Sequence, residues 1–504
     1  MNVPVYAPPT LKKLWQDRVN ETPDKNFLIE NDKKYTYKEI DSLVDEKIKE
    51  LKHLKIQKGD LIALQFELDV ENIVTILACL KLETVINPLN PHFDIDEITN
   101  LVERFRPYAI ISQKALRGRD IFCNIDHLNS YSSYNKGDLK YFIRNERKTV
   151  FQNYENNFNS SVLVLNTSGT SGLPKGVVLT NQNILEAEYS YNEAFRISKE
   201  DMILMPSGMY HAIGFHHGLI STIIAGSTMV IMRHYNVKQM AQLINKYPIS
   251  YIDSLPTVMY DILFKIKSLG HLRQLICGGD KIKDTLLRQA KVRHIPLYNC
   301  YGLTEAVPFS YTPAKYYSEH AGMTTAVRPI ESVEVRIVNE KGEIVQPNKK
   351  GTIEVKGPVV FKEYLLQPEK TKDAFDHGWF NTGDIVHYTT DGLIEIDGRN
   401  SDMIIRGGEN IAAHAVEEKI RQCEDIEDVA VLGIPDLRLG QRIGAFIVLY
   451  KDHHDFSKDI LLSKLKNNNV DKKLWPEKIW VVEELPKTAN GKIKKYLLRK
   501  LAKG

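Results

Sequence analysis

The sequence predicts an α/β fold, with a large N-terminal domain of α/β subdomains that includes a β subdomain, and a small α+β domain at the C-terminus. Three observations support this prediction. The chain has 504 residues, more than a single hydrophobic core usually serves. Short apolar runs rich in β-branched residues alternate with helical patterns such as residues 37–54, which is typical of parallel strands joined by helices. From about residue 327 to 395 short strands are separated by turns, which indicates the β subdomain.

The expected elements can be placed along the chain. Thr36 and Glu39 make a capping signal at the start of the helix at 37–54. After the polar stretch 397–402, the remaining residues read as strand, helix, strand, strand, helix and strand. The apolar runs expected to form strands of the α/β part lie at residues 61–65, 108–112, 162–165, 228–232, 251–253 and 272–277.

Composition and charge exclude several classes of protein. Apolar residues make up 43% and charged residues 26%, so disorder is not expected. The net charge of +3 is spread along the chain and gives no basic face, so we expect no nucleic-acid partner. The one local excess is the lysine-rich stretch 487–503, for which a membrane-surface or nucleic-acid patch is the alternative to a catalytic loop and terminal helix.

Cysteine usage and hydropathy indicate a cytoplasmic enzyme without stable membrane insertion. The N-terminus shows no charged segment followed by an apolar stretch, so we expect no secretory signal. The uncharged, mostly apolar run 218–232 is shorter than a membrane span and is expected to form a buried helix followed by a strand. The five cysteines are scattered without metal-ligand spacing, as suits a reducing compartment: Cys79, Cys123, Cys277, Cys300 and Cys423.

The segment 166–176 carries the strongest chemical signal, because it combines small hydroxyls, glycines and one lysine. It lies between two strand-like runs, 162–165 and 177–179. Backbone N–H groups and hydroxyls of such a loop can approach an anion closely, and the lysine adds a positive charge. The segment therefore predicts a cradle for a triphosphate. It reads Asn166, Thr167, Ser168, Gly169, Thr170, Ser171, Gly172, Leu173, Pro174, Lys175 and Gly176.

The spacing differs from the P-loop of common ATPases and kinases. Counted from Gly169, Pro174 takes the place of the second glycine. Gly176 follows Lys175, where a magnesium-binding hydroxyl is required. For this segment alone, a Gly/Ser-rich surface turn without a ligand is the alternative.

Four further motifs follow the cradle in the chain. They are Tyr301-Gly302-Leu303-Thr304-Glu305, Phe380-Asn381-Thr382-Gly383-Asp384, the stretch from Gly398-Arg399 to Gly408, and Pro486-Lys487-Thr488-Ala489-Asn490-Gly491-Lys492-Ile493. In type and order, the five segments resemble the motifs of the acyl-adenylate-forming superfamily, which includes acyl-CoA synthetases, firefly luciferase and the adenylation domains of peptide synthetases. The resemblance covers nearly the whole chain.

The resemblance implies that a carboxylate attacks the α-phosphate of ATP and forms an acyl-adenylate and pyrophosphate. Negative charge accumulates on the phosphoryl oxygens, so cations and hydrogen-bond donors are needed there. Thr304 would bond the α-phosphate, and Glu305 would hold Mg²⁺. The cradle residues implied for the β- and γ-phosphates are Thr167, Ser168, Gly169, Thr170, Ser171, Gly172 and Lys175.

The adenosine part of ATP is assigned by the same resemblance. Tyr301 would supply a flat face for adenine, followed by Gly302. The segment Gly278-Gly279-Asp280 would leave room for the edge of the base and place an acceptor beside it. Asp384 would accept the ribose hydroxyls, and Arg399 would join it at ribose or phosphate.

The C-terminal part is implied to be a mobile lid, residues 403–504, joined by a hinge at 400–402 to an N-terminal adenylation domain at 1–399. Lys492 would bring its ammonium to the attacking carboxylate and the α-phosphate. For transfer to CoA the lid would swing about the hinge, and the strand around Gly408 would line the thiol tunnel.

Some residues depart from the family pattern. The hinge position two residues beyond Arg399 is usually Lys or Asp, but here it is Ser401. Ala413 and Ala415 replace the proline and the first glutamate of a motif in the lid. Thr180-Asn181 stands where Thr-His is common. The lid departures bear on thioester formation more than on adenylation.

Segment 209–215 indicates the acid. Amino-acid-activating relatives place an aspartate here to pair with the substrate ammonium, and this segment has none. Tyr210-His211, followed by apolar and small residues, resembles acyl- and aryl-CoA ligases, in which the histidine lies beside the carboxylate. His211, His216 and His217 do not match the spacing of a common metal site.

The leading hypothesis is therefore an AMP-forming acyl-CoA synthetase that uses ATP, Mg²⁺ and CoA and activates a fatty acid. An aromatic acid is the nearest alternative for the substrate. A second hypothesis delivers the acyl group to the phosphopantetheine of an acyl carrier protein. The third is a noncatalytic nucleotide-binding relative, which the presence of Lys175, Glu305, Asp384, Arg399 and Lys492 disfavours.

Overall fold

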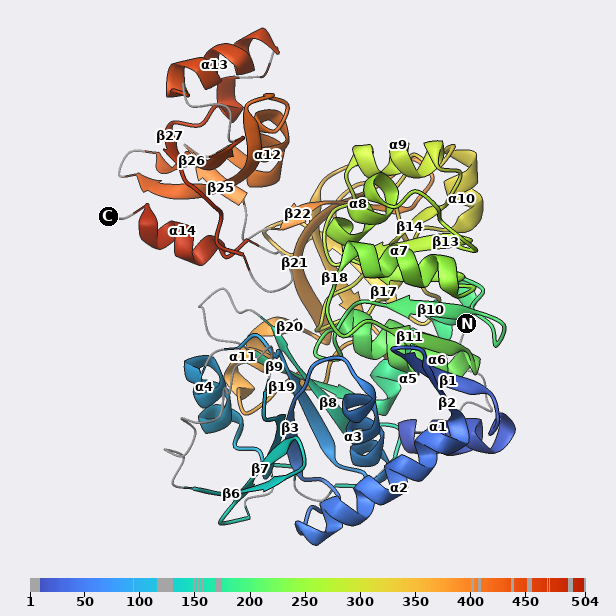
Figure 1. Ribbon diagram of the computed structural model, residues 1–504. Coiled ribbons are helices and arrows are strands. Elements are labelled where there is room, and N and C mark those ends of the chain that lie inside the picture. Colours follow the sequence, from blue (N-terminus) through green and yellow to red (C-terminus); the bar gives the residue numbers. More distant parts are fainter. Residues whose placement is uncertain are drawn as a thin grey trace.

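The computed structural model describes residues 10–93, 95–115, 130–147, 150–151, 154–155, 157–167, 175–399, 403–406, 409–436, 439–450, 456–468, 470, 472–487 and 493–502. Four β-sheets with helices around them form a mixed α/β architecture, which confirms the predicted fold class (Figure 1). Residues from 403 onward, orange to red, form a smaller unit at one end of the molecule (Figure 1). Within the described residues, none of the helices combines the length and apolarity that crossing a membrane requires.

The first sheet has eight strands and includes β8 and β9, which flank the predicted cradle in sequence. Its order is β19-β9-β8-β4-β3-β5-β7-β6. The pairs β3/β4, β3/β5 and β4/β8 are parallel, and the outer pairs are antiparallel. The strands are β3 (Leu61–Gln65), β4 (Val85–Leu89), β5 (Ala109–Gln113), β6 (Tyr131–Lys136), β7 (Leu139–Arg144), β8 (Ser161–Thr167), β9 (Lys175–Thr180) and β19 (Glu363–Tyr364).

The second sheet has nine strands in the order β16-β15-β14-β13-β12-β10-β11-β1-β2. Its six central strands, from β14 to β1, are parallel. The strands are β1 (Asn26–Glu30), β2 (Lys33–Thr36), β10 (Met202–Met205), β11 (Thr228–Ile231), β12 (Tyr251–Ser254), β13 (Gln274–Gly278), β14 (Leu297–Tyr301), β15 (Ser310–Tyr311) and β16 (Arg328–Pro329).

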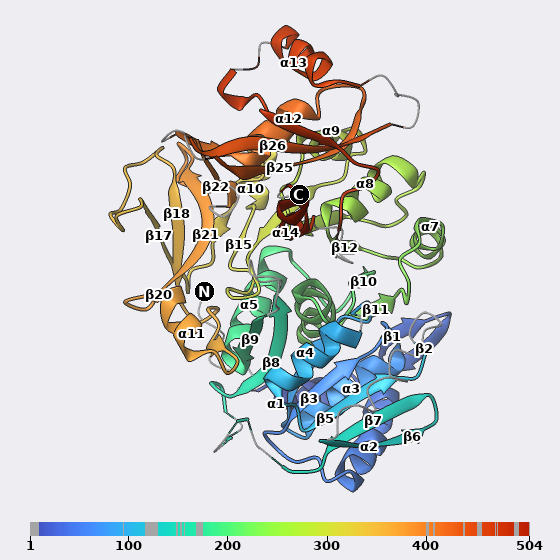
Figure 2. The same ribbon diagram turned by 90° about the vertical axis from the view of Figure 1, so that its left-hand side faces the viewer.

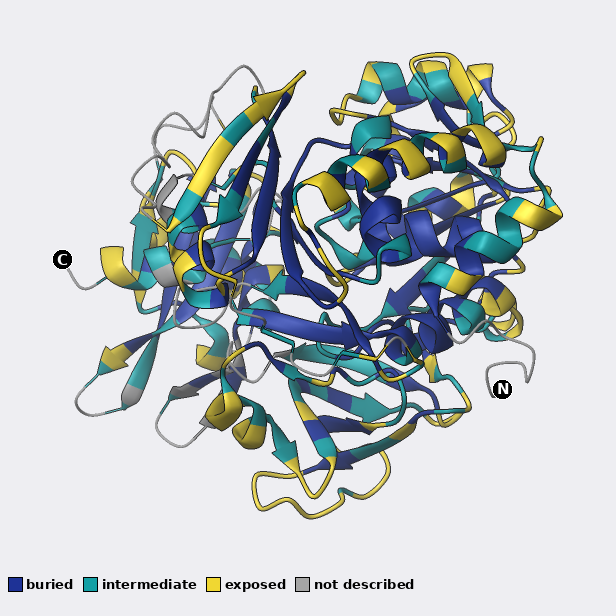
Figure 3. Cartoon of the chain, turned by 90° about the horizontal axis from the view of Figure 1, so that it is seen from below, coloured by how far each residue is buried: buried dark blue, intermediate teal, exposed yellow. Residues whose placement is uncertain are grey.

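Helices cover both sheets and fill the space between them. Buried residues of both sheets belong to one core, among them Ile62 and Ile276. A second core lies between the other face of the second sheet and α7 to α9. The helices are α1 (Leu11–Glu21), α2 (Tyr37–His53), α3 (Val70–Lys81), α4 (Ile95–Phe105), α5 (Asn181–Ala194), α6 (Ser221–Ala225), α7 (Val237–Lys246), α8 (Pro256–Lys265), α9 (Asp284–Val292) and α10 (Ala314–Glu319). Figure 3 shows the buried strands in dark blue beneath helices whose outer faces are exposed.

The third sheet is antiparallel and lies in the stretch for which a β subdomain was predicted. Strand order is β17-β18-β21-β20, and β22 pairs with the long strand β21. This pairing places Asp384 directly opposite Arg399. The elements are β17 (Glu334–Val338), β18 (Gly351–Lys356), α11 (Pro368–Ala374), β20 (Phe375–Asp376), β21 (Trp379–Tyr388) and β22 (Ile394–Arg399).

The C-terminal unit has a five-stranded sheet in the order β24-β23-β26-β25, with β27 parallel to β26. Its buried residues form cores of their own, which include Val416 and Phe446. The elements are β23 (Met403–Arg406), β24 (Glu409–Ala412), α12 (Ala413–Ile420), β25 (Ile426–Asp436), β26 (Gly440–Leu449), α13 (Lys458–Asn467), a 3₁₀ turn (Lys472–Leu474), β27 (Lys478–Val481) and α14 (Lys495–Leu501). Figure 2 shows α12 on the side of this unit that faces α9.

Two local expectations were incomplete. The sequence predicted one strand before the first helix of the C-terminal unit, but β23 and β24 form an antiparallel hairpin there, with Ile404 opposite Ile411. The helix predicted within 218–232 is present, but it begins earlier as a π-helix, η2 (Ile213–Ile220), which continues into α6. The capping signal was correct, because Thr36 and Glu39 form a capping box on α2.

Candidate active site

The predicted phosphate cradle joins the two strands of an antiparallel hairpin at the edge of the first sheet. Strands β8 and β9 pair so that Thr167 lies opposite Lys175. Ser168, Gly169, Thr170, Ser171 and Gly172, which were predicted to hold phosphates, lie outside the described residues. Gly176 is required by packing, because a Cβ there would come within 2.9 Å of the Phe105 ring. The described ends of the cradle therefore place Thr167 and Lys175 side by side.

A second set of predicted residues follows strand β14, where Tyr301 ends the strand. Gly302 comes next in a tight loop, in which an added Cβ would lie 2.5 Å from Cα of Pro308. The N–H of Leu303 donates to the carbonyl of Ala306 at 2.9 Å and closes the loop that carries Thr304. The geometry of this loop therefore demands a glycine, whatever ligand it holds.

Tyr301 and Asp384, predicted for adenine and ribose, are in direct contact. The hydroxyl of Tyr301 donates to Oδ2 of Asp384 at 2.8 Å. Asp384 is 3% exposed, and its N–H donates to the hydroxyl of Thr382 at 3.0 Å. The side chain of Arg399 lies outside the described residues, although its backbone faces Asp384.

Glu305 and Lys175, predicted for Mg²⁺ and phosphate, both contact one tyrosine that was not predicted from the sequence. The hydroxyl of Tyr364 donates to Oε1 of Glu305 at 3.0 Å. The Nζ of Lys175 lies 4.2 Å from the centroid of the same ring. No local motif marks Tyr364, which stands in the two-residue strand β19. Its pairing with β9 brings it to the site.

His211 lies two residues before the first residue of the π-helix, Ile213. Its N–H donates to the carbonyl of Gly208 at 3.2 Å, and its carbonyl accepts from Phe215 at 2.9 Å. The turn is tight, because a Cβ on Gly214 would lie 2.2 Å from the carbonyl oxygen of Gly208. The half-buried imidazole packs at 4.3 Å against Tyr210.

Segment 278–280 lies at the end of strand β13, and the next residue, Lys281, forms an ion pair with Glu418 of the C-terminal unit. An added Cβ on Gly278 would lie 2.8 Å from the carbonyl of Cys300, so the neighbouring strand already requires this glycine. Gly279 has φ +81°, which favours glycine. Asp280 is exposed and accepts from the N–H of Lys281 at 2.8 Å.

A buried polar cluster that the sequence did not predict lies behind strand β14. Glu188 of α5 and His217 of the π-helix form an ion pair at 3.3 Å. Tyr191 stacks on the His217 ring at 4.2 Å and donates to Asp253 at 2.7 Å. Burial raises the pKa of Asp253 to about 6, and raises the pKa of the Cys300 thiol to about 11. His217 therefore has a carboxylate partner inside the core.

Two ion pairs anchor the segments on either side of the predicted catalytic lysine. Lys487 Nζ lies 2.7 Å from Asp428, and Lys495 Nζ lies 3.1 Å from Glu417 on α12. Lys487 and Ile493 also form a β-bridge. Lys492 itself and Gly408, predicted to line the thiol tunnel, lie outside the described residues.

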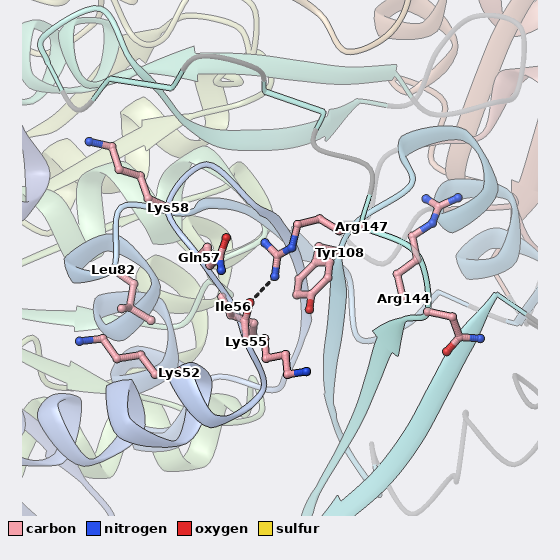
Figure 4. A pocket seen from close by; sticks show the side chains of 10 residues that line it. Lys52, Lys55, Ile56, Gln57, Lys58, Leu82, Tyr108, Arg144 and Arg147 are labelled. Atoms are coloured by element: carbon pink, nitrogen blue, oxygen red, sulfur yellow. Dashed lines mark hydrogen bonds between the residues drawn. The ribbon is translucent and has the colours of Figure 1, made fainter.

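A hollow of about 630 Å³ lies away from these residues, at the amino ends of strands β3 and β5 (Figure 4). Its central cation, Arg147, donates to both carboxylate oxygens of Asp60 at 2.8 and 2.6 Å and lies 4.0 Å from the centroid of the Tyr108 ring. No residue predicted for nucleotide or acid lines it. The lining residues are Lys52, Lys55, Ile56, Gln57, Lys58, Leu82, Tyr108, Arg144, Asn145 and Arg147.

Comparison with protein families gives two matches in the order of the chain. The family model described as AMP-binding enzyme matches residues 15–365. The model described as AMP-binding enzyme C-terminal domain matches residues 415–492.

Curated relatives match over nearly the whole chain. The medium-chain fatty-acid–CoA ligase of Escherichia coli (strain K12) is 31% identical over 522 residues, covering 98% of this chain and 91% of that protein. The 2-succinylbenzoate–CoA ligase of Bacillus pumilus (strain SAFR-032) is 28% identical over 483 residues, covering 96% of each.

Solved structures share the fold. ATP-bound MatB from Rhodopseudomonas palustris matches with a TM-score of 0.82 at 24% identity, over 100% of this chain and 99% of that one. MenE from Bacillus subtilis, in complex with the acyl-adenylate intermediate OSB-AMP, matches with a TM-score of 0.83 at 24% identity, over 98% of each chain. At this identity the likeness shows the fold alone.

Proposed function

The chain belongs to the AMP-binding enzyme family and is an AMP-forming acid–thiol ligase, and on this premise we propose that it joins a fatty acid to CoA. ATP and CoA as substrates, and Mg²⁺, fit this class of enzyme. The acid would first displace pyrophosphate from ATP, and the thiol would then displace AMP from the acyl-adenylate.

One observation gives the main support for the residues proposed to bind the phosphates of ATP. Tyr364 contacts both Lys175 and Glu305. Lys175, which begins strand β9, therefore lies over the face of the Tyr364 ring, and the carboxylate of Glu305, from the loop after β14, accepts from its hydroxyl. Lys175 would attract the phosphates. A single carboxylate fits Mg²⁺, which is usually held by one or two carboxylates together with phosphates and water. The metal would neutralise charge on the phosphates.

The Tyr301–Asp384 contact supports the assignment of the adenosine end. The carboxylate of Asp384 can accept ribose hydroxyls, and the Tyr301 ring offers a face for stacking. Tyr301 ends β14 and begins the loop that carries Thr304 and Glu305. We propose roles for Thr304 at the α-phosphate and for Arg399 at ribose or phosphate on the family pattern.

The apolar character of the acid rests on two observations. No acidic residue occurs in segment 209–215, which carries His211 and starts the π-helix. The π-helix itself is mostly apolar and buried, with Phe215 and Leu219 both at 0% exposure. The 31% identity to a medium-chain fatty-acid–CoA ligase agrees with such an acid. The 28% identity to a 2-succinylbenzoate–CoA ligase favours an aromatic acid as the second candidate.

The proposed role of the lid combines residues that lie far apart in the sequence. We propose that residues 403–504 turn about a hinge at 400–402 and bring Lys492 to the carboxylate and the α-phosphate. The anchors Lys487–Asp428 and Lys495–Glu417 support this role, because they fix both ends of the loop to the C-terminal unit.

The decisive test is acid-dependent release of AMP with CoA, across fatty acids of short, medium and long chain and aromatic acids. We expect the largest kcat/KM with a fatty acid. A preference for an aromatic acid would contradict the proposed fatty-acid substrate and would leave the proposed reaction unchanged. Pyrophosphate exchange without CoA tests adenylation alone, and acyl carrier protein in place of CoA tests the acceptor. No exchange with any acid would contradict the proposed activity as a whole.

A further inference from the structure

Tyr364 lies between two groups of opposite charge. Its hydroxyl donates to Oε1 of Glu305 at 3.0 Å, and its ring centroid is 4.2 Å from Nζ of Lys175. The side chain is nearly buried, at 4% exposure. Among the described residues no other side chain donates a hydrogen bond to Glu305. One residue therefore touches both the carboxylate proposed for Mg²⁺ and the ammonium proposed for phosphate.

The backbone holds this tyrosine against both partners. Strand β19 pairs with β9, the strand that begins at Lys175, with Tyr364 opposite Val177 (Figure 1). The N–H of Leu365 donates to the carbonyl of Gly176 at 2.8 Å. On the other side, the N–H of Phe361 donates to the carbonyl of Glu305 at 2.8 Å. The segment 361–365 is thus bonded to the cradle hairpin and to the loop after β14.

The side chain has little freedom to move. Its own N–H donates to the hydroxyl of Thr371 at 2.9 Å. The ring packs on Phe361 with centroids 4.7 Å apart. A buried ring held on two sides keeps its rotamer, so its hydroxyl stays aimed at the carboxylate.

We propose that Tyr364 is a positioning residue of adenylation, whose hydroxyl orients the Glu305 carboxylate for Mg²⁺ and whose ring holds the Lys175 ammonium beside the cradle. This inference rests on the proposed function. The hydroxyl and the ring of Tyr364 have different roles in it. A hydrogen bond to a metal-binding carboxylate fixes its orientation, and the loss of such a partner typically lowers metal affinity 10- to 100-fold.

The hydroxyl can do this because it remains a donor. A tyrosine hydroxyl carries its proton at neutral pH and donates through it, and this one lies 3.0 Å from Oε1 of Glu305. If the ring of Tyr364 only filled space, Tyr364→Phe would not change Mg²⁺ binding. This variant therefore distinguishes a role of the hydroxyl from simple packing of the ring.

The experiment compares Tyr364→Phe with Tyr364→Leu in the full chain. Calorimetry measures the binding of a nonhydrolysable ATP analogue as a function of Mg²⁺ concentration, and again with EDTA. For Tyr364→Phe we expect the Mg²⁺ concentration at half-saturation to rise about ten-fold, with unchanged affinity in EDTA. For Tyr364→Leu we expect an additional loss in EDTA of roughly two- to five-fold, because the ring over Lys175 is gone.

Tyr247→Phe is the matched control. The hydroxyl of Tyr247 also donates to a carboxylate, that of Asp32 at 2.8 Å, at the other end of the second sheet. It should bind nucleotide and Mg²⁺ as the wild type does.

The outcomes are separable. An unchanged Mg²⁺ response in Tyr364→Phe would overturn the role of the hydroxyl. Tighter binding by Tyr364→Leu in EDTA would overturn the role of the ring, since the ring would then be keeping Lys175 away from phosphate. These binding measurements need no carboxylic acid, so they are independent of the AMP-release assay with different acids. A wild-type enzyme that binds nucleotide but activates no acid would contradict the proposed function, not the role of Tyr364.

Discussion

The hydroxyl of Tyr301 donates a hydrogen bond to Oδ2 of Asp384 at 2.8 Å, and so joins the end of the central strand β14 to the long strand β21 of the third sheet. Asp384 is nearly buried, and its backbone is fixed opposite Arg399. A carboxylate held in this way has lost little of its capacity to accept, because one carboxylate offers about four acceptor positions. Ribose hydroxyls can share it with the tyrosine.

Asp384→Asn should weaken ATP binding by about 10- to 100-fold, since hydrogen bonds to a charged group contribute about 1.5–3 kcal/mol. Tyr301→Phe keeps the ring and loses one bond to Asp384, so its loss should be smaller, about five-fold. Calorimetric titration with ATP measures both. Asp391→Asn, in the turn before β22, is the control. Wild-type affinity in Asp384→Asn would remove this residue from the site.

An ion pair links the C-terminal unit to the larger part of the molecule, next to segment 278–280. Lys281 Nζ lies 3.3 Å from Glu418 of α12, and both side chains are about half exposed, at 44% and 53%. An exposed pair contributes only about 0–1 kcal/mol. It can still shift the balance between two lid orientations of similar free energy.

Lys281→Glu should therefore change the ratio of adenylation to thioester formation by up to about five-fold and leave the melting temperature unchanged. Pyrophosphate exchange and CoA-dependent AMP release give the two rates. The double variant Lys281→Glu, Glu418→Lys restores the pair and should restore the ratio. If the double variant behaves as the single one does, the ion pair does not control the lid.

Local signals predicted the elements that frame the site. The apolar runs at 162–165 and 177–179 lie in β8 and β9. Two β-branched runs joined by a loop of small residues indicate a hairpin without information from the rest of the chain. Thr36 and Glu39 specify the start of α2 in the same local way. The residues Tyr301 and Asp384 were identified because the short motifs that contain them resemble those of the family.

Contacts that depend on pairing between distant segments of the chain were not predicted from the sequence. Tyr364 reaches Lys175 because β19 adds to the edge of the first sheet, and a two-residue strand leaves no pattern of its own. Glu188 is at 0% exposure although it stands on a helix with polar residues, because α5 lies between two sheets and is covered on several sides. Periodicity describes one buried face, so a charged residue inside the core goes unrecognised.

Lys492→Ala should lower the rate of adenylation by ~10²- to 10³-fold, because it removes one preorganised charge from the transition state. Binding of ATP should change far less, since the ammonium is proposed to act on the attacking carboxylate and the α-phosphate. Acid-dependent pyrophosphate exchange measures the effect. Lys494→Ala, two residues further on, controls for a general change in the loop. An exchange rate equal to that of the wild type would remove Lys492 from the mechanism.

The ion pair between Glu188 and His217 makes stability depend on pH. Burial opposes the charge on His217, but the Glu188 carboxylate, with Asp253 and Cys300 also near, holds the pKa of His217 well above its usual value. A group whose pKa is raised on folding stabilises the protein fully below its unfolded pKa of about 6.5, and the contribution disappears as the pH rises through the folded value. The neighbouring His216 behaves oppositely, because burial lowers its pKa.

Glu188→Gln should therefore destabilise the protein most at low pH. Breaking a buried pair costs roughly 3–5 kcal/mol, and Glu188→Gln takes away the carboxylate that is paired with the imidazole. The difference between wild type and variant should be largest near pH 5.5 and shrink towards pH 9. Urea midpoints across this range measure the difference, and Glu193→Gln on the exposed side of α5 is the control. A difference that stays constant with pH would mean that His217 is neutral in the folded protein.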